Sequence, residues 1–205
     1  DAFLAQAQYP AKPPLPHILG RDAVGEVLEV GDGVTSVRSG DVVGLLRCEA
    51  GVTTRGTLAE KTAVPASVLV PIPEGWSQQE MAGAPLVFLT AWQALTQWSE
   101  PEAPPAPGTV LLVTGASGGV GVASVLLGKS MGLTVVALSR SASKGEKLRE
   151  LGAEATAIQA DFSRIVVRLA GQHLQIAGGA SPVADAGEFG RIARRSQQPL
   201  LVDPV

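Results

Sequence analysis

The stretch V-T-G-A-S-G-G-V-G-V-A-S, Val113 to Ser124, decides the fold of the second half of this chain. An apolar run, Val110 to Val113, leads into it, and an apolar-periodic segment follows it. A strand, a glycine-rich turn and a helix, in this order, are the arrangement that holds the pyrophosphate of a dinucleotide. The glycines let the backbone approach the ligand, and the helix N-terminus offers free N–H groups and the positive end of its dipole.

The segments on both sides of this turn alternate between strand and helix patterns. Strands are expected at Val110–Thr114, Thr134–Leu138 and Ala155–Gln159, and helices at Val120–Met131 and Lys144–Leu151. Strands that alternate with helices predict an α/β domain with a parallel, doubly wound sheet of the Rossmann type.

The spacing of the next expected strand is unusual. Ile165 to Leu169 also has a strand pattern, but only the five residues from Ala160 to Arg164 separate it from the strand before it. Parallel neighbours need a crossover of about a dozen residues or more. Either these two strands are not parallel neighbours, or a βα unit is absent from the sequence. Ser196 to Pro199 forms a similarly abrupt join.

The first half of the chain has β patterns and turn signals. Short strands are expected at Ala23–Val30, Val34–Val37, Val42–Leu46, Thr57–Val64 and Val68–Ile72. Gly31-Asp32-Gly33 is a turn signal between the first two. Short strands at this spacing predict a small barrel or sandwich.

The pattern changes near Ser77, where S-Q-Q-E predicts a capping box with Glu80. Helix formers continue to Trp98 with a break at Pro85, and Trp92 and Trp98 are expected in the core. The proline-rich segment Glu100 to Gly108 predicts a connector without helix or sheet. We therefore expect a β-rich domain over 1–84, a nucleotide-binding domain over 85–195, and a return toward the first domain over 196–205.

Composition excludes several classes of protein. Of the 205 residues, 45% are hydrophobic and 17% charged, and the net charge is −3, so a nucleic-acid partner is not expected. No uncharged apolar run approaches the ~18 residues of a membrane span. The first residues do not resemble a secretory signal. A single cysteine, Cys48, forbids an internal disulfide and suits the cytoplasm, which is the predicted location.

The end of the second strand of the α/β domain predicts which nicotinamide cofactor is bound. An NAD site needs an acidic side chain about 20 residues beyond the glycines, to bond the ribose 2′-hydroxyl. Here the chain has Ser139, Arg140 and, further on, Lys144, with no acid before Glu146. A hydroxyl followed by two cations suits a 2′-phosphate, so NADPH is the predicted cofactor.

The glycine turn fits two oxidoreductase patterns. Thr114-Gly115 with Gly119 and Gly121 matches the T-G-x-x-x-G-x-G of short-chain dehydrogenases, but 108 residues precede Thr109 and the only tyrosine, Tyr9, lies upstream. A β-rich domain followed by a Rossmann domain instead resembles the medium-chain dehydrogenase/reductase superfamily. Leu15–Val43 resembles its GroES-like catalytic domain, as do Gly56–Glu60. Further resemblances lie at Pro85–Leu95, Ala116–Gly121, Lys147–Ala153 and Gly171–Gly178.

This resemblance also leads to predictions about zinc binding and about the oligomeric state. Zinc-dependent members use a cysteine and a Gly-His-Glu, where this chain has Val42–Leu45 and Gly20-Arg21-Asp22, so no zinc is expected. Asp22 is expected to form a structural salt bridge, and His17 and His173 to be packing or surface residues. Gly171–Gly178 resembles a strand that pairs across a dimer, which predicts a homodimer. The opening strands and part of the second Rossmann half of the family are absent.

The zinc-free branch of the family is similar to quinone oxidoreductases and enone or enoyl reductases. The resemblance implies an NADPH-dependent reductase of a quinone or an α,β-unsaturated carbonyl, with no metal. It assigns Tyr9 to the acceptor oxygen and Thr90 to the nicotinamide end. The alternatives are that Tyr9 is a packing residue and that the Thr90 hydroxyl bonds the backbone of its own helix. The other cofactor-binding residues that it implies are Ser117, Gly118, Gly119, Val120, Gly121, Ser139, Arg140 and Lys144. The alternatives are a non-catalytic NADPH-binding or structural protein, and an enoyl reductase acting on carrier-bound acyl thioesters.

Overall fold

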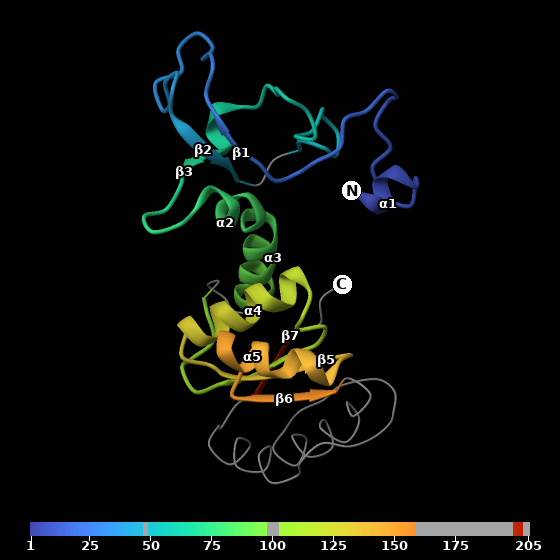
Figure 1. Cartoon of the computed structure of the whole chain (residues 1–205), viewed down its shortest axis with the longest axis vertical. Helices are drawn as coiled ribbons and strands as arrows, with labels where there is room; N and C mark the ends of the chain where they lie inside the picture. The colour runs from blue at the N-terminus through green and yellow to red at the C-terminus, as the bar shows by residue number, and fades with distance from the viewer. Residues whose placement is uncertain (47–48, 98–102, 159–198, 203–205) are drawn as a thin grey trace. The chain divides into compact units, whose positions relative to one another are not determined.

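The structure, a computed structural model, describes residues 1–46, 49–97 and 103–158 and the backbone of 199–202. The chain divides into two units, Asp1–Leu89 and Thr90–Val205, and each is described by itself (Figure 1). Cys48, Trp98, His173 and the segments Ile165–Leu169 and Gly171–Gly178 lie outside the described residues.

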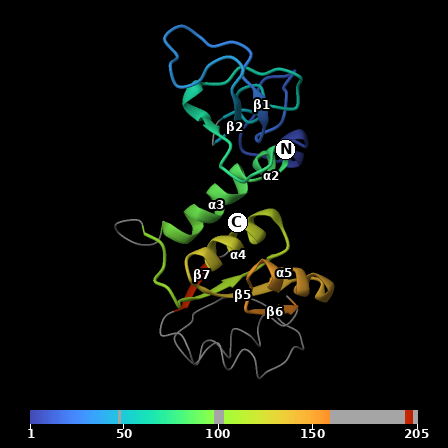
Figure 2. The same ribbon diagram turned by 60° about the vertical axis from the view of Figure 1, so that its left-hand side comes forward.

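The described strands of the first unit form one antiparallel sheet in the order β1-β2-β3. Its strands are β1 (Val24–Glu26), β2 (Val42–Leu45) and β3 (Leu69–Pro71). Val24 faces Gly44, and Val43 faces Pro71. Figure 2 shows β1 and β2 side by side. A short helix, α1 (Ala2–Ala5), opens the unit, and the 3-10 turn η1 (Ala66–Val68) precedes β3.

The prediction of strands is wrong for two segments of the first unit. Residues 34–37 and 57–64 are loops, so the described residues form a three-stranded sheet and not a complete barrel. The N–H groups of Gly56, Thr57 and Leu58 do bond other backbone, namely the carbonyls of Ile18, Gly20 and Leu19. This crossing of two loops satisfies the backbone groups without a regular strand ladder.

Two helices follow the sheet, as the sequence predicts. Helix α2 (Gln78–Gly83) begins at the expected capping box, in which Ser77 accepts from the N–H of Glu80 and the Glu80 side chain accepts from Ser77. Helix α3 (Pro85–Thr96) begins at Pro85. Met81 of α2 is buried and packs on Gly44 of β2, where any side chain would collide with it.

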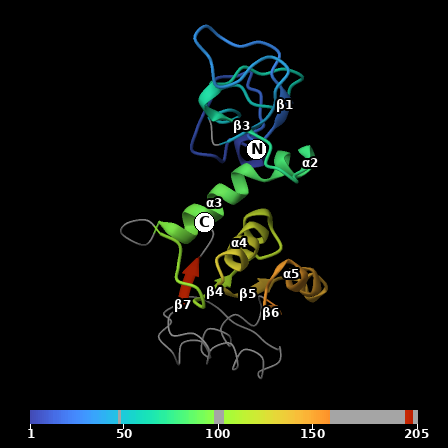
Figure 3. The same cartoon turned by 90° about the vertical axis from the view of Figure 1, so that its left-hand side faces the viewer.

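The second unit holds a parallel sheet in the order β6-β5-β4-β7. The strands are β4 (Val110–Val113), β5 (Thr134–Ser139), β6 (Ala155–Ile158) and β7 (Pro199–Val202). The helices α4 (Gly119–Ser130) and α5 (Gly145–Leu151) connect β4 to β5 and β5 to β6, with a 3-10 turn, η2 (Ala142–Lys144), before α5. Both helices cover the same face of the sheet (Figure 3).

The position of β7 differs from the expected return toward the first domain. It pairs in parallel with β4, with Val110 opposite Pro199 and Val113 opposite Val202. The first strand of the unit, β4, therefore has β5 on one side and β7 on the other. In an open parallel sheet, this reversal of strand order is the point where ligands bind, outside the carboxyl ends of the strands.

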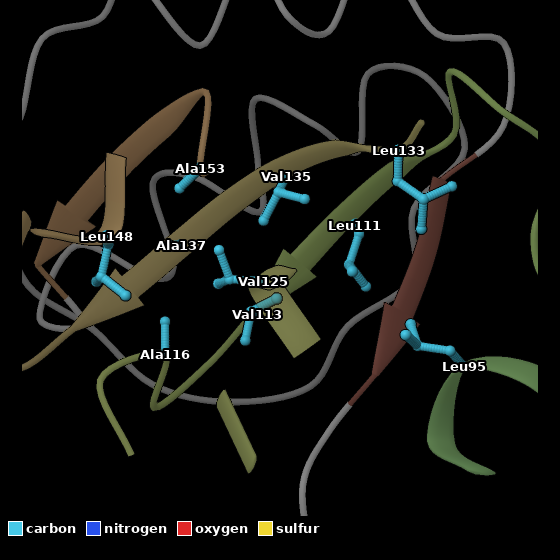
Figure 4. Packing of buried hydrophobic residues seen from close by; sticks show 10 residues of the cluster. All are labelled: Leu95, Leu111, Val113, Ala116, Val125, Leu133, Val135, Ala137, Leu148 and Ala153. Carbon is cyan, nitrogen blue, oxygen red and sulfur yellow. The ribbon is translucent and has the colours of Figure 1, made fainter. Parts of the chain in front are cut away.

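The core of the second unit lies between the sheet and its helices. Figure 4 shows the ten buried residues of this cluster. They are Leu95, Leu111, Val113, Ala116, Val125, Leu133, Val135, Ala137, Leu148 and Ala153. All four residues of β4 are buried, which fits a central parallel strand covered on both faces. Among the described residues, no helix is long and apolar enough to cross a bilayer.

The expectation that Trp92 belongs to the core is wrong. Its side chain on α3 is 45% exposed, whereas Ala91 and Leu95 of the same helix are buried. An aromatic residue in an apolar helical pattern predicts burial only when it lies on the packed face, and tertiary packing selects that face.

Candidate cofactor site

The glycine turn between β4 and α4 has the tight geometry that a dinucleotide loop requires. Gly115 has a φ of +57°, in the left-handed region, and its carbonyl accepts a hydrogen bond of 2.9 Å from the N–H of Gly118. A Cβ on Gly121 would lie 2.5 Å from the Gly115 oxygen and 2.6 Å from the Ala116 Cα. Only glycine at position 121 lets helix α4 pack this closely on the turn.

The first turn of α4 presents free backbone donors. Gly118 is the N-cap residue, without a side-chain cap, and the first bond into the helix runs from the Val122 N–H to the Gly118 carbonyl at 2.8 Å. Within the described part of the chain, the N–H groups of Gly119, Val120 and Gly121 have no acceptor. Three donors at the positive end of a helix of 12 residues favour an anionic group.

Hydrogen bonds connect the glycine turn to the carboxyl end of β5. The N–H of Ala116 donates to the Leu138 carbonyl at 2.8 Å, and the Ser139 hydroxyl donates to the Ser117 hydroxyl at 3.3 Å. The Ser139 oxygen also accepts from the N–H of Ser141 at 3.3 Å. Ser139 is only 3% exposed. These bonds hold the phosphate-binding turn and the residues after β5 in one fixed arrangement.

The two cations expected to bind a 2′-phosphate follow directly after β5. Arg140 and Lys144 are both exposed, and neither is in an ion pair with a described acidic residue. Between them, the Ser141 and Ser143 hydroxyls share a hydrogen bond of 2.7 Å. The edge of the sheet beside β5 therefore carries hydroxyls and two available positive charges, and the nearest acid in sequence is Glu146 of α5.

The remaining expected site residues lie elsewhere. Tyr9 is in the first unit, is 37% exposed, and has a hydroxyl without a hydrogen-bond partner among the described residues. Thr90 is exposed on α3 and is the first residue of the second unit. The structure thus brings Ser117, Ser139 and the residues between Gly118 and Gly121 together, while the roles of Tyr9 and Thr90 stay predictions.

The prediction that Asp22 forms a structural salt bridge is wrong. Its carboxylate is in no ion pair among the described residues and instead accepts a hydrogen bond of 3.1 Å from the N–H of Leu86, in the first turn of α3. Burial raises the pKa of Asp22, while the bond from Leu86 and the charge of Arg21 oppose that rise. No local pattern in the sequence links residues 64 positions apart, so this role was missed.

A metal site is not assembled by the described residues. No group of three or more His, Cys, Asp or Glu side chains among them could hold an ion. His17 is partly buried, and its Nε2 atom has no hydrogen-bond partner within the described chain. The absence of zinc stays a prediction.

The residues present fit a dinucleotide. The free donors of α4 suit the pyrophosphate, and the close approach at Gly121 leaves no side chain over the turn. Arg140 and Lys144 suit a further phosphate beside β5. The strand order and this turn together define a nucleotide-binding domain of the Rossmann type.

Comparison with known proteins agrees with this geometry. Residues 1–74 match the alcohol dehydrogenase GroES-like domain. The chain is 35% identical over 191 residues to a quinone oxidoreductase-like protein 2 homolog of Nematostella vectensis, which covers 91% of this chain and 48% of that protein. It is 37% identical over 153 residues to the polyketide synthase GfsB of Streptomyces halstedii, covering 74% of this chain and 2% of the synthase.

Solved structures share the fold. An alcohol dehydrogenase superfamily protein from Novosphingobium aromaticivorans aligns with a TM-score of 0.73 and 34% identity, over 83% of this chain and 51% of that one. The quinone oxidoreductase from Thermus thermophilus, solved also with NADPH, aligns with a TM-score of 0.64 and 30% identity, over 83% and 49%. Residues 1–74 thus match an alcohol dehydrogenase GroES-like domain, and over most of its length the chain is similar to quinone oxidoreductase-like and alcohol dehydrogenase superfamily proteins. It spans about half the length of these relatives, and far less of the synthase.

Proposed function

We propose that this chain is the core of an NADPH-dependent reductase that transfers hydride to a quinone or an α,β-unsaturated carbonyl without a metal. The main support for the proposal is the set of residues that follows β5 at the edge of the sheet. There, Arg140 and Lys144 are exposed and free of described acidic partners, next to a glycine turn whose helix donors are free.

We assign the following roles to the residues of the candidate site. The N–H groups of Gly119, Val120 and Gly121 hold the pyrophosphate, and Arg140 and Lys144 hold the 2′-phosphate. The bound cofactor supplies the hydride that the acceptor takes up. Tyr9, whose hydroxyl has no partner among the described residues, donates a hydrogen bond to the acceptor oxygen. Conjugated acceptors are already electron-poor, so hydride transfer to them depends mainly on the orientation of the acceptor and on the exclusion of water.

Metal independence is part of the proposal. The family's metal ligands would stand at Val42–Leu45 and at Gly20-Arg21-Asp22, and these side chains include no histidine or cysteine. Without a Lewis acid, an alkoxide would lack its usual means of stabilisation, so alcohols are not the proposed substrates.

The test is consumption of NADPH with a panel of small quinones and enones, with NADH measured in parallel. We expect turnover with at least one acceptor, a preference for NADPH, and no loss of rate after treatment with a chelator. Binding of NADPH without turnover of any acceptor would instead support a non-catalytic role. Elemental analysis that found one zinc per chain would contradict the metal-free proposal.

The similarity to a polyketide synthase favours one further candidate, reduction of an enoyl thioester on an acyl carrier. The same panel distinguishes it, because a carrier-bound or pantetheine-linked enoyl substrate would then turn over faster than the free enone. The proposed homodimer rests on Gly171–Gly178, and light scattering of the purified chain tests it.

A further inference from the structure

The hydroxyl of Ser139 is buried, and the protein itself uses its hydrogen. The residue is only 3% exposed. A serine hydroxyl has one hydrogen to donate, and Ser139 donates it to the Ser117 hydroxyl at 3.3 Å. The Ser139 oxygen also accepts a hydrogen bond of 3.3 Å from the N–H of Ser141. Because phosphate oxygens are chiefly hydrogen-bond acceptors, no hydrogen of Ser139 remains for a phosphate bound at this edge of the sheet.

The hydrogen bond between Ser139 and Ser141 encloses Arg140. A serine oxygen that accepts from the N–H two residues further on closes a tight turn of side chain and backbone. Arg140 is the middle residue of this turn, so its backbone is held while its side chain is exposed. Among the described residues, no acidic side chain forms an ion pair with Arg140. The Ser139 hydroxyl therefore helps to set the direction in which the Arg140 side chain leaves the sheet.

The glycine turn has a further attachment to β5 that does not involve the Ser139 side chain. The N–H of Ala116 donates to the Leu138 carbonyl at 2.8 Å, from backbone to backbone. Within the turn, the N–H of Gly118 donates to the Gly115 carbonyl at 2.9 Å. Loss of the Ser139 hydroxyl should therefore leave the free donors of α4 in place, and its main effect should fall on Arg140.

We propose that Ser139 is a positioning residue, which orients Arg140 toward the 2′-phosphate of NADPH and makes no contact with the cofactor. This inference rests on the proposed function, in which Arg140 binds that phosphate. Bonds between a guanidinium group and a phosphate are strong and directional. A side chain whose backbone is already fixed also loses less conformational entropy when it binds. Ser139 should therefore affect NADPH and not NADH, which lacks the 2′-phosphate.

The test measures the Kd for NADPH and the Kd for NADH by fluorescence titration of the full chain. In Ser139→Ala we expect the Kd for NADPH to rise by about threefold to tenfold, as for one lost hydrogen bond, and the Kd for NADH to stay within about twofold. Ser139→Thr keeps the hydroxyl and should restore the Kd for NADPH to within about twofold of wild type. Ser130→Ala is the control, because its exposed hydroxyl donates to the Leu127 carbonyl.

A double-mutant cycle with Arg140→Ala separates the indirect role of Ser139 from direct contact with the phosphate. If Ser139 acts through Arg140, Ser139→Ala in the Arg140→Ala background should change the Kd for NADPH by less than about twofold. A hydroxyl that touched the 2′-phosphate itself would give the same threefold to tenfold loss in both backgrounds. A purely structural role would weaken NADPH and NADH alike.

Three results would overturn the inference while the proposed function stands. They are an unchanged Kd for NADPH in Ser139→Ala, an equal loss of NADPH affinity with and without Arg140, and an equal weakening of both cofactors. A wild-type chain that binds NADPH no better than NADH overturns the proposed function itself and is seen before any variant is made. If Ser139→Ala does not fold, Ser139→Cys, which has a similar size and a weaker hydrogen-bonding group, is judged by the same criteria.

Discussion

The hydroxyl of Ser139, at the end of β5, donates a hydrogen bond of 3.3 Å to the hydroxyl of Ser117 in the glycine turn. The two residues are 22 positions apart and belong to neighbouring parallel strands and their following loops. Because Ser139 also accepts from the N–H of Ser141, one buried oxygen links the pyrophosphate turn to the loop that carries Arg140. The two parts of the candidate site that we propose to bind phosphate are thus linked by hydrogen bonds.

Replacement of Ser139 by alanine should weaken this coupling. A net hydrogen bond contributes about 0.5–1.5 kcal/mol, so we expect NADPH affinity to fall by roughly threefold to tenfold. Fluorescence titration measures the change. Ser130→Ala is the control, because that exposed hydroxyl donates to the Leu127 carbonyl at the end of α4, away from the turn. Equal NADPH affinity in Ser139→Ala and wild type would show that the link does not matter for the site.

Arg140→Ala should change the choice of cofactor. Loss of a charged hydrogen bond to the 2′-phosphate costs about 1.5–3 kcal/mol, so the Kd for NADPH should rise at least about tenfold. NADH has no 2′-phosphate, and its Kd should stay within about twofold. Lys61→Ala, which removes an exposed cation from the first unit, controls for net charge. Parallel weakening of both cofactors would argue against a 2′-phosphate contact.

Gly121→Ala should damage the second unit. The added Cβ would lie 2.5 Å from the Gly115 oxygen and 2.6 Å from the Ala116 Cα, both backbone atoms that cannot swing aside. We expect a loss of about 1–3 kcal/mol in the free energy of unfolding, together with loss of cofactor binding. Denaturant unfolding and titration measure the two effects. Gly83→Ala, at the end of α2 with nothing near its Cβ position, should leave stability equal or slightly higher.

The capping box of α2 predicts an acid-sensitive first unit. The backbone N–H of Ser77, and then its hydroxyl, lower the pKa of Glu80 below the ordinary value of 4.5. A lowered pKa in the folded state gives stability that is complete above 4.5 and is lost as the pH falls through the folded-state pKa. The thermal midpoint of Glu80→Gln should therefore fall less steeply on acidification than that of wild type. Glu74→Gln, exposed and outside the box, should follow the wild-type curve.

Local chemistry made several elements predictable. The S-Q-Q-E signature places the start of α2 at Ser77, and Pro85 separates α2 from α3. The glycine turn identifies β4 and α4 because its backbone requirements hold in any context. The first unit was less predictable. Residues 57–64 alternate as a strand does, yet their first amides bond a crossing loop near Gly20, a partner that no local pattern reveals.

The sequence alone determined the nucleotide turn, the absence of an acid after β5 and the family resemblance, because each depends on which residue stands at which spacing. Only the tertiary structure decided which groups are free and which are engaged. In the structure, β7 pairs with β4, and the Trp92 side chain is exposed. The Asp22 carboxylate accepts a hydrogen bond from the N–H of Leu86 and forms no ion pair with a described cation. These outcomes depend on contacts between residues far apart in the chain, where packing and desolvation outweigh the preferences of any local segment.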